Sequence, residues 1–335
     1  MQNIINNEIS ISGNVSWGII GCGDVTEVKS GPAFNKVPGS SLVAVMRRDG
    51  ARAKDYAQRH GVQYWFDDAD ALINHPEVNA IYVATPPKYH EAYTLAAINA
   101  GKPVYVEKPM SVDVASCMRM MEASANSGVK LTVAHYRRAL PKFIQIKTML
   151  DEQLIGDIRA INIRLLSNDT SAKTTSGWRV DPAIAGAGLF YDLAPHQLDL
   201  LYYYFGDTVA AYGFSANQAG LYAAEDIVTG IIQLDNNIMV STTWCFTAAE
   251  TVKEDIFEII GSKGTIAFPV FGHTIYIETA SGKEIISFDP PTHIQQPMIE
   301  NVVQFFSGKG PNPCTAEAAI RSMKIMEQFV CGHSR

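Results

Sequence analysis

A short loop with two glycines follows the first apolar run of the chain. Gly21 and Gly23 come directly after residues 15–20, and a helical stretch begins beside them. Glycine at the first position permits a tight turn, and glycine at the second lets a pyrophosphate approach the backbone. A helix start also offers free N–H groups to an anion. The sequence therefore predicts a dinucleotide-binding loop formed by Gly21, Cys22, Gly23, Asp24 and Val25.

This loop lacks the third glycine of the usual fingerprint, and Thr26 stands in its place. A Gly-x-Gly pair alone also occurs in ordinary tight turns. Its position after the first strand of an alternating strand and helix pattern favours the nucleotide interpretation. No neighbouring residue marks Cys22 as a nucleophile.

The end of the second apolar run, residues 41–46, bears on the choice between NAD and NADP. An acidic residue there would hydrogen-bond a ribose 2′-hydroxyl, whereas Arg47 and Arg48 occupy the position. A guanidinium pairs well with a phosphate or stacks on adenine. The pair favours NADP, with a solvated surface pair as the alternative. Asp49 lies close enough to keep NAD possible.

Two later runs of the same region end in residues suited to a ligand site. Thr85 and Pro86 follow the run 80–84, and His90 comes four residues after Pro86. Glu107 and Lys108, in a Glu-Lys-Pro sequence, follow the run 103–106. Ligands bind at the carboxyl edge of a parallel sheet, so we expect these residues to line the cofactor. The alternative for Lys108 is a simple charge at a strand end.

Asp192 and His196 stand four residues apart in a predicted helix, which puts them on one face. An isolated pair of this kind is more often a surface feature. With the Gly21-x-Gly23 loop, the Thr-Pro-Pro segment and Glu-Lys-Pro, however, the set resembles the glucose–fructose oxidoreductase / inositol dehydrogenase / MocA family (Gfo/Idh/MocA). The resemblance covers nearly the whole chain.

The resemblance implies NAD(P)-dependent hydride transfer at a secondary alcohol or ketone, usually of a sugar, a cyclitol or a related compound. It implies that Lys108 is the catalytic lysine, His196 the acid/base and Asp192 the supporting carboxylate. The chemistry agrees, because a histidine near neutrality can exchange the hydroxyl proton and an ammonium can stabilise charge on the substrate oxygen.

Four further residues are candidates for the substrate pocket. Tyr136 and Arg137 follow the last strand of the first region, and Trp178 and Arg179 precede the helix that carries Asp192. An aromatic face can stack on a sugar ring, and an arginine can bind hydroxyls or acids. A solvent-facing hinge for the first pair and a packed tryptophan for the second remain open.

The first 135 residues alternate short apolar runs with helical stretches, which predicts a Rossmann-type doubly wound parallel sheet. The remainder, 136–335, reads as an α+β domain: helices flank a long series of strands between residues 208 and 288. A large, mainly antiparallel open sheet is expected there. We assign dinucleotide binding to 1–135, and substrate binding and oligomerisation to 136–335.

Composition limits the remaining possibilities. The chain has 335 residues, 47% of them apolar, and a net charge of −7, so it lacks the positive field expected of a nucleic-acid or membrane-surface protein. Five scattered cysteines and the absence of His-x-x-x-His spacing argue against a disulfide framework and a metal site. No apolar window is long enough to span a bilayer. We expect a cytoplasmic protein without a metal.

Besides reduction of an aromatic or tetrapyrrole substrate, which the acid/base trio favours less than an alcohol substrate, three functions remain in view. The first is a dehydrogenase that exchanges NADP, or NAD, with solution. The second is an enzyme whose tightly held cofactor cycles within one turnover, in hydrolysis or epimerisation. The third is a dinucleotide-binding regulator, disfavoured because Lys108, Asp192 and His196 are all present. The resemblance also implies a homodimer or homotetramer formed through the C-terminal sheet.

Overall fold

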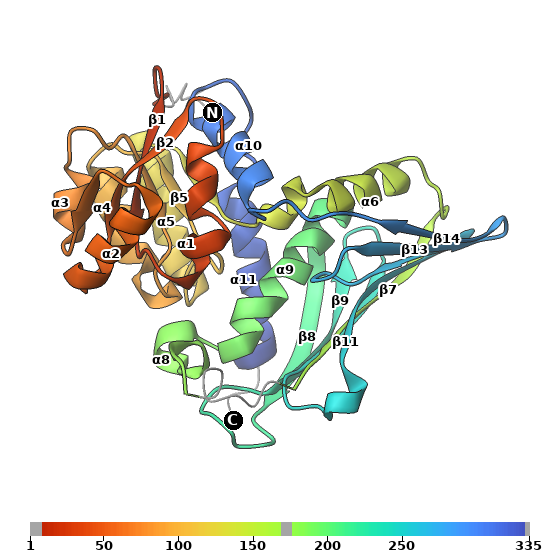
Figure 1. Cartoon of the computed structure of the whole chain (residues 1–335). Coiled ribbons are helices and arrows are strands. Elements are labelled where there is room, and N and C mark those ends of the chain that lie inside the picture. The colour runs from red at the N-terminus through yellow and green to blue at the C-terminus, as the bar shows by residue number, and fades with distance from the viewer. Residues whose placement is uncertain (1–8, 169–175, 332–335) are drawn as a thin grey trace. The chain divides into compact units, whose positions relative to one another are not determined.

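The computed structural model describes residues 9–168 and 176–331 (Figure 1). Two compact units are present: residues 1–136 with 291–320, and residues 137–290 with 321–335. Residues 291–320, assigned to the second domain from sequence, pack with the first unit. The roles given to the two domains stay predictions.

The first unit is built on six parallel strands in the order β3-β2-β1-β4-β5-β6. They are β1 (Val15–Ile20), β2 (Ser40–Met46), β3 (Tyr64–Phe66), β4 (Ala80–Val83), β5 (Val104–Val106) and β6 (Leu131–Val133). The predicted Rossmann sheet is confirmed. The sequence pattern missed β3, which has only three residues and an exposed Trp65 at its centre.

Helices connect these strands and cover the sheet (Figure 1). They are α1 (Asp24–Val28), α2 (Gly50–His60), α3 (Ala69–Ile73), α4 (His90–Asn99) and α5 (Val114–Ser127). The ends of α2 follow from its sequence. The Asp49 side chain accepts a hydrogen bond from the N–H of Arg52, and Gly61 ends the helix with φ +65°.

Residues 291–320 return to the first unit through α10 (Gln296–Phe306). The centre of the Phe306 ring lies 5.5 Å from that of Trp17 on β1, and the centre of the Phe34 ring lies 4.7 Å from the same indole. This aromatic packing joins residues almost 300 positions apart in the sequence.

The second unit contains eight strands in the order β14-β13-β12-β11-β7-β10-β9-β8. They are β7 (Ile158–Leu166), β8 (Thr208–Ala216), β9 (Ile227–Leu234), β10 (Met239–Cys245), β11 (Glu254–Gly261), β12 (Gly264–Phe268), β13 (Thr274–Thr279) and β14 (Gly282–Ser287). All neighbours are antiparallel except β7 and β10. The expected large, mainly antiparallel sheet is confirmed.

Helices cover one face of this sheet (Figure 1). The second unit contributes α6 (Pro141–Asp151), α8 (Pro182–Ala185), α9 (Gly188–Phe205) and residues 321–331 of α11 (Ala316–Cys331). Phe190 of α9 packs on Trp244 at 5.1 Å. At Gly213 and Gly230 the ring of Phe329 comes so close that a β-carbon would collide with it. Glycine is therefore required where α11 lies on β8 and β9.

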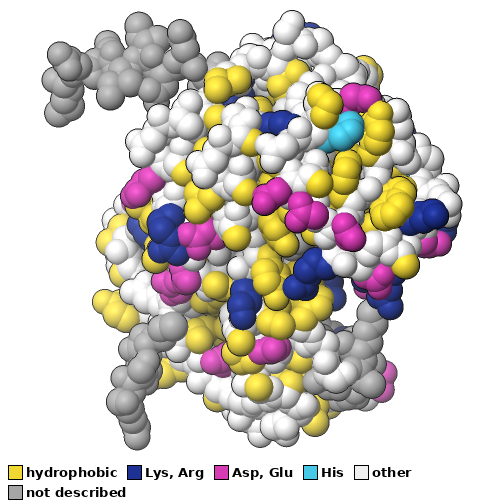
Figure 2. Space-filling view, turned by 90° about the vertical axis from the view of Figure 1, so that its left-hand side faces the viewer, with side chains coloured by type: hydrophobic (Ala, Val, Ile, Leu, Met, Phe, Trp, Pro, Cys, Tyr) yellow, Lys and Arg dark blue, Asp and Glu magenta, His cyan; other side chains and the backbone are white. Residues whose placement is uncertain are grey.

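The outer surface carries charges of both signs. Figure 2 shows basic and acidic side chains interspersed with apolar ones over the face in view. Within the described ranges, none of the helices combines the length and apolar character needed to cross a bilayer.

Candidate active site

Gly21 forms the turn between β1 and α1 in a conformation that favours glycine. Its φ is +95°, and a β-carbon would lie 2.8 Å from Thr85 Cγ2 and 2.9 Å from the carbonyl carbon of Ala84. The turn therefore passes directly against the end of β4. Glycine is required here for both reasons.

The space beside Gly23 fits a dinucleotide. A β-carbon at Gly23 would meet only the Gly21 carbonyl oxygen, at 3.9 Å, so this side of the loop is open. Asp24, which is exposed, and the half-buried Val25 begin α1 directly after it. At the end of β4, Thr85 Oγ1 is buried without a hydrogen-bond partner among the described residues. A loop that is open at Gly23 and is followed directly by a helix suits a pyrophosphate.

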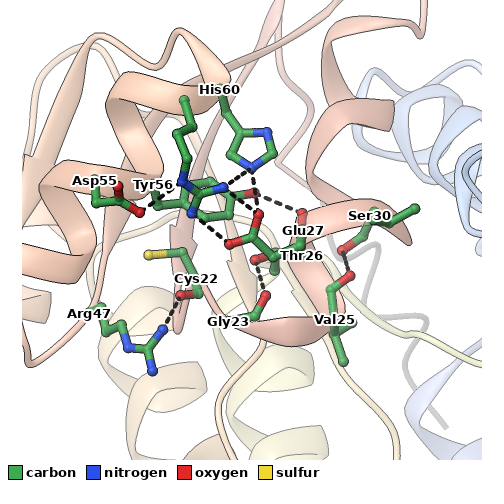
Figure 3. A network of polar contacts seen from close by, with 12 residues as sticks. Cys22, Gly23, Val25, Thr26, Glu27, Ser30, Arg47, Asp55, Tyr56 and His60 are labelled. Carbon is green, nitrogen blue, oxygen red and sulfur yellow. Dashed lines mark hydrogen bonds and ion pairs between the residues drawn. The ribbon is translucent and has the colours of Figure 1, made fainter.

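Thr26, in the position of the missing glycine, ties the loop to α2. Its hydroxyl donates to the Gly23 carbonyl oxygen at 2.8 Å, and Tyr56 Oη donates to the Thr26 carbonyl oxygen at 2.8 Å. Figure 3 shows both bonds. A β-carbon at Gly31 would collide with the Thr26 carbonyl and the Tyr56 hydroxyl. The backbone of 23–26 is thus fixed by a buried tyrosine.

A cluster of charges holds the outer side of α1 (Figure 3). Arg59 donates to both carboxylate oxygens of Glu27 at 2.8 Å, and the His60 ring lies 2.8 Å from the same carboxylate. Asp55 accepts from Arg59 at 2.8 Å. The hydrogen bonds from Arg59, and after them those from His60, lower the pKa of Glu27 to about 2. α1 is therefore anchored to α2 by charge as well.

The two arginines after β2 lie near the loop and take different partners. Arg47 Nη1 donates to the Cys22 carbonyl oxygen at 3.2 Å, and the Arg48 guanidinium lies 5.0 Å from the centre of the Tyr89 ring. Asp49 caps α2 and pairs with Arg52 at 3.3 Å. Burial raises the pKa of the Cys22 thiol to about 11, so the residue is no nucleophile near neutrality.

The Glu107 side chain is buried within the first unit. Its carboxylate accepts hydrogen bonds from Tyr82 Oη at 2.5 Å and from Gln295 Nε2 at 2.7 Å, and it also accepts the N–H of Lys108 at 3.1 Å. The carboxylate therefore fixes the backbone from which the half-buried Lys108 side chain extends. Direct contact of Glu107 with a cofactor stays a prediction.

Gln295 was missed from the sequence, since nothing local distinguishes it. It is buried, and besides Glu107 it binds Tyr105 Oη at 3.2 Å and donates its own N–H to the Lys29 carbonyl. One residue of the returning segment thus connects the end of α1 to the Glu107 turn.

His90 connects the two turns at the sheet edge. Its Nε2 lies 2.7 Å from the Thr85 carbonyl oxygen, and its Nδ1 lies 3.0 Å from that of Pro109. Burial lowers its pKa, which favours the neutral imidazole. Pro86 begins the short 3-10 turn η2 (Pro87–Tyr89) that leads to His90. These contacts agree with a role in ordering the loop.

In the second unit, Asp192 and His196 lie one turn apart on α9, as the spacing predicted. Arg179 Nε lies 3.3 Å from Asp192 Oδ2, and its guanidinium lies 4.6 Å from the centre of the Trp178 ring. His196 is 5% exposed, and its ring meets that of Phe271 edge to face at 5.5 Å. The structure therefore brings Trp178, Arg179 and Asp192 together and surrounds His196 with protein.

The segment after β6 lies inside the protein. Tyr136 is buried. The Arg137 guanidinium donates to the Val270 carbonyl oxygen at 2.6 Å and lies over the Phe271 ring at 4.5 Å. Arg138 forms a bidentate pair with the buried Asp199 at 2.6 and 2.7 Å. A hinge with solvent-facing charges, the alternative left open by the sequence, does not describe these arginines.

The described residues were compared with the ligand sets of metal sites and with disulfide pairs. In 9–168 and 176–331, no three His, Cys, Asp or Glu side chains are grouped as a metal site would require. The cysteines at 22, 117, 245 and 314 are free thiols.

Known proteins resemble the chain over both units. The Gfo/Idh/MocA profile described as an oxidoreductase family with an NAD-binding Rossmann fold matches residues 15–135, and the profile of the Gfo/Idh/MocA C-terminal domain matches 143–267. "Oxidoreductase P35" of Formosa agariphila is 43% identical over 95% of this chain and 98% of its own length.

A more distant relative and a solved structure are also similar over most of the chain. A 1,5-anhydro-D-fructose reductase of Ensifer adhaerens is 26% identical over 92% of each chain. A levoglucosan dehydrogenase, solved in complex with NADH and levoglucosan, shares the fold with a TM-score of 0.86 at 20% identity, over 94% of this chain and 96% of that one. The loop at Gly21, the sheet of the first unit and the profile matches agree, and the chain belongs to the Gfo/Idh/MocA family of NAD-binding oxidoreductases.

Proposed function

We propose that the protein transfers a hydride between NADP(H) and a secondary alcohol or ketone of a sugar, a cyclitol or a related small molecule. The observation that carries the proposal is the arrangement on α9, where Asp192 and His196 share a face and Arg179 pairs with Asp192. The relatives named for 1,5-anhydro-D-fructose and levoglucosan support a carbohydrate-like substrate.

A bound NADP(H) would supply the hydride acceptor for the carbinol carbon in oxidation and the hydride donor in reduction, and the loop 21–25 with Arg47 would hold it. The His196 imidazole takes the hydroxyl proton during oxidation and gives it back during reduction. The Lys108 ammonium donates a hydrogen bond to the substrate oxygen and stabilises the charge that develops there. Asp192, held by Arg179, supports the histidine from the preceding turn of α9.

The remaining pocket candidates recognise the substrate by two kinds of contact. Trp178 offers an aromatic face, and the Arg179 guanidinium beside it offers donors for hydroxyl groups. We propose that Tyr136 and Arg137 shape the pocket from within the protein, since Tyr136 is buried and Arg137 holds a loop carbonyl.

Preference for NADP rests on the residues after β2. Arg47 lies at the loop through its bond to the Cys22 carbonyl, and Arg48 lies over Tyr89. Asp49 is engaged as the cap of α2 and by Arg52, so it is a poor partner for a ribose 2′-hydroxyl. Guanidinium groups here favour a 2′-phosphate.

The cofactor proposal is tested by calorimetric titration with NADPH and NADH, after the preparation is assayed for bound dinucleotide. We expect tighter NADPH binding, and we expect Arg47→Asp to weaken NADPH more than NADH. Arg52→Met is the matched control, since Arg52 is exposed and pairs with the cap residue Asp49. Equal losses for both dinucleotides would remove the 2′-phosphate argument. A preparation already loaded with NAD(H) would favour the enzyme that recycles its cofactor.

The catalytic roles are tested with 1,5-anhydro-D-fructose, levoglucosan and myo-inositol. Variants His196→Gln and Lys108→Met should each lower turnover by about 100-fold or more while NADPH affinity stays near the wild-type value. Unchanged turnover in either variant would exclude that residue from the chemistry.

We also propose a homodimer or homotetramer formed through the open face of the second sheet. One row of side chains crosses the sheet on this face, and Tyr212, Ile231 and Ile285 in it are 65%, 62% and 66% exposed. Tyr212 and Ile231 are neighbours on β8 and β9, and Ile285 lies on β14 at the other edge of the sheet; exposed apolar residues on one sheet face are typical of an interface. Ile231→Arg should yield monomers in analytical ultracentrifugation, and an unchanged mass would place the interface elsewhere. The free thiols support a cytoplasmic location.

A further inference from the structure

We propose that Arg137, Lys142 and Asp255 are positioning residues that fix the loop 269–272 and thereby hold Phe271 against His196. These three side chains bind backbone atoms of four consecutive loop residues. The inference rests on the proposed role of His196 and extends it to residues that no sequence motif marks.

Lys142 holds the two ends of the loop. Its ammonium donates to the Pro269 carbonyl oxygen at 2.5 Å and to the Gly272 carbonyl oxygen at 2.7 Å. Lys142 is 4% exposed although it is a lysine in the first turn of α6. A lysine is rarely buried to this extent without a specific partner. Here the partners are the two carbonyl groups, so the side chain joins the two ends of the loop, and burial lowers the pKa of its amino group to about 7.

Asp255 and Arg137 hold the middle of the loop. The carboxylate of Asp255, on β11, accepts the N–H of Val270 at 2.9 Å and that of Phe271 at 2.6 Å. Arg137 Nη1 donates to the Val270 carbonyl oxygen at 2.6 Å. Bonds between a charged group and a backbone dipole are about twice as strong as neutral ones. The connection between β12 and β13 is therefore held much more firmly than a surface hairpin loop.

Phe271 is the side chain that this arrangement presents. Its ring contacts the His196 imidazole edge to face at 5.5 Å, and the Arg137 guanidinium lies 4.5 Å from the centre of the same ring. The loop bonds fix the N–H of Phe271 itself, so the ring has little freedom to move away. An apolar ring in this place keeps water from one side of the imidazole and restricts its orientation.

The inference is tested by titrating His196 in the full chain. NMR of protein labelled with ¹³C at the histidine Cε1 position monitors the titration. The His196 signal is identified as the one lost in His196→Gln. We expect Phe271→Leu to raise the midpoint of this titration by about half a pH unit or more, because water then reaches the protonated ring. Lys142→Met should produce a shift in the same direction, since the loop loses both of its end bonds.

Lys147→Met is the matched control on the same helix. Lys147 is solvent-accessible and pairs with Asp151 at 2.5 Å, so its removal should leave the His196 midpoint unchanged. A folded Lys142→Met protein with the wild-type midpoint would overturn the positioning role. Should that variant not fold, Asp255→Asn removes the charge that binds the Val270 and Phe271 N–H groups, and an unshifted midpoint there has the same meaning. If the His196 midpoint does not shift in Phe271→Leu, the Phe271 ring has no influence on the imidazole and the inference is wrong.

The pH profile of turnover separates this inference from the proposed function. If His196 is the base, the acidic limb of the profile for alcohol oxidation moves to higher pH in Phe271→Leu together with the NMR midpoint. An NMR shift with an unmoved acidic limb would leave the positioning role intact and exclude His196 as the base.

Discussion

Two loops beside the proposed chemistry are held by opposite means. In the first unit, α1 and the nucleotide loop are anchored by Glu27, whose partners Arg59 and His60 lie on the outer side of α2. In the second unit, the loop 269–272 is held by the side chains of Lys142 and Asp255, which bind its backbone atoms at part-buried positions. The first arrangement is a set of ion pairs near water. The second is a set of hydrogen bonds between ionisable side chains and backbone groups.

The difference predicts how each loop responds to perturbation. Solvent-exposed ion pairs contribute little to stability and are weakened by salt and by acid. Removing a buried charge leaves its partners unsatisfied, which costs far more. The nucleotide loop should therefore respond to solution conditions, and the loop 269–272 should respond to mutation.

The largest effect is expected for Lys142→Met. Loss of the amino group removes the donor that Lys142 offers to the part-buried carbonyl oxygens of Pro269 and Gly272, and the free energy of unfolding should fall by about 3 kcal/mol. Urea unfolding followed by circular dichroism measures this. Lys147→Met, which removes an exposed pair on the same helix, should stay within about 0.5 kcal/mol of the wild type. If the two variants lose similar amounts of unfolding free energy, the buried lysine contributes no more to stability than the exposed one.

The next effect concerns the buried part of the nucleotide loop. Tyr56→Phe removes the donor to the Thr26 carbonyl and should cost about 1 to 1.5 kcal/mol of unfolding free energy, with weaker NADPH binding. Tyr64→Phe is the control, because the Tyr64 hydroxyl bonds to Glu77 at an exposed position. A Tyr56→Phe protein with wild-type stability and NADPH affinity would show that Thr26 holds the loop without help from α2.

Prediction from sequence succeeded where the signal was local. The Gly21 turn after β1 and the Asp192–His196 face of α9 each depend on residues within a few positions, and both have the predicted secondary structure. The order of the parallel sheet follows from repeated strand and helix units. β3 was missed because its three residues carry no alternation that a strand would require.

The contacts that fix the site are not local, which is why the sequence did not reveal them. Gln295 reaches Glu107 across 188 positions, and Lys142 reaches Pro269 across 127. Neither residue lies in a motif, and a glutamine or a lysine in an average sequence is usually exposed. Arg137 was singled out for its position after β6, but its partner, the Val270 carbonyl, is 133 residues away.

A third prediction concerns acid. Because the folded-state pKa of Glu27 is lowered to about 2 from 4.5, its contribution is complete above pH 4.5 and is lost as the pH falls toward 2. The carboxylate is partly exposed, so we expect about 1 kcal/mol near neutral pH. Glu27→Gln should be less stable than the wild type by this amount near neutrality and equal to it near pH 2. A difference that stays constant over this range would mean that packing, not charge, anchors α1.

The smallest effect is that of salt on the same pair of proteins. Raising NaCl to about 1 M shortens the screening length to about 3 Å, comparable to the 2.8 Å separation of Glu27 and Arg59. The stability difference between the wild type and Glu27→Gln should shrink by about half, as measured by urea unfolding at both salt concentrations. The Lys142→Met difference should not change, because salt does not penetrate to a lysine that is 4% exposed. A salt response of equal size in both variants would contradict the view that the Glu27 ion pairs are accessible to salt and the Lys142 bonds are not.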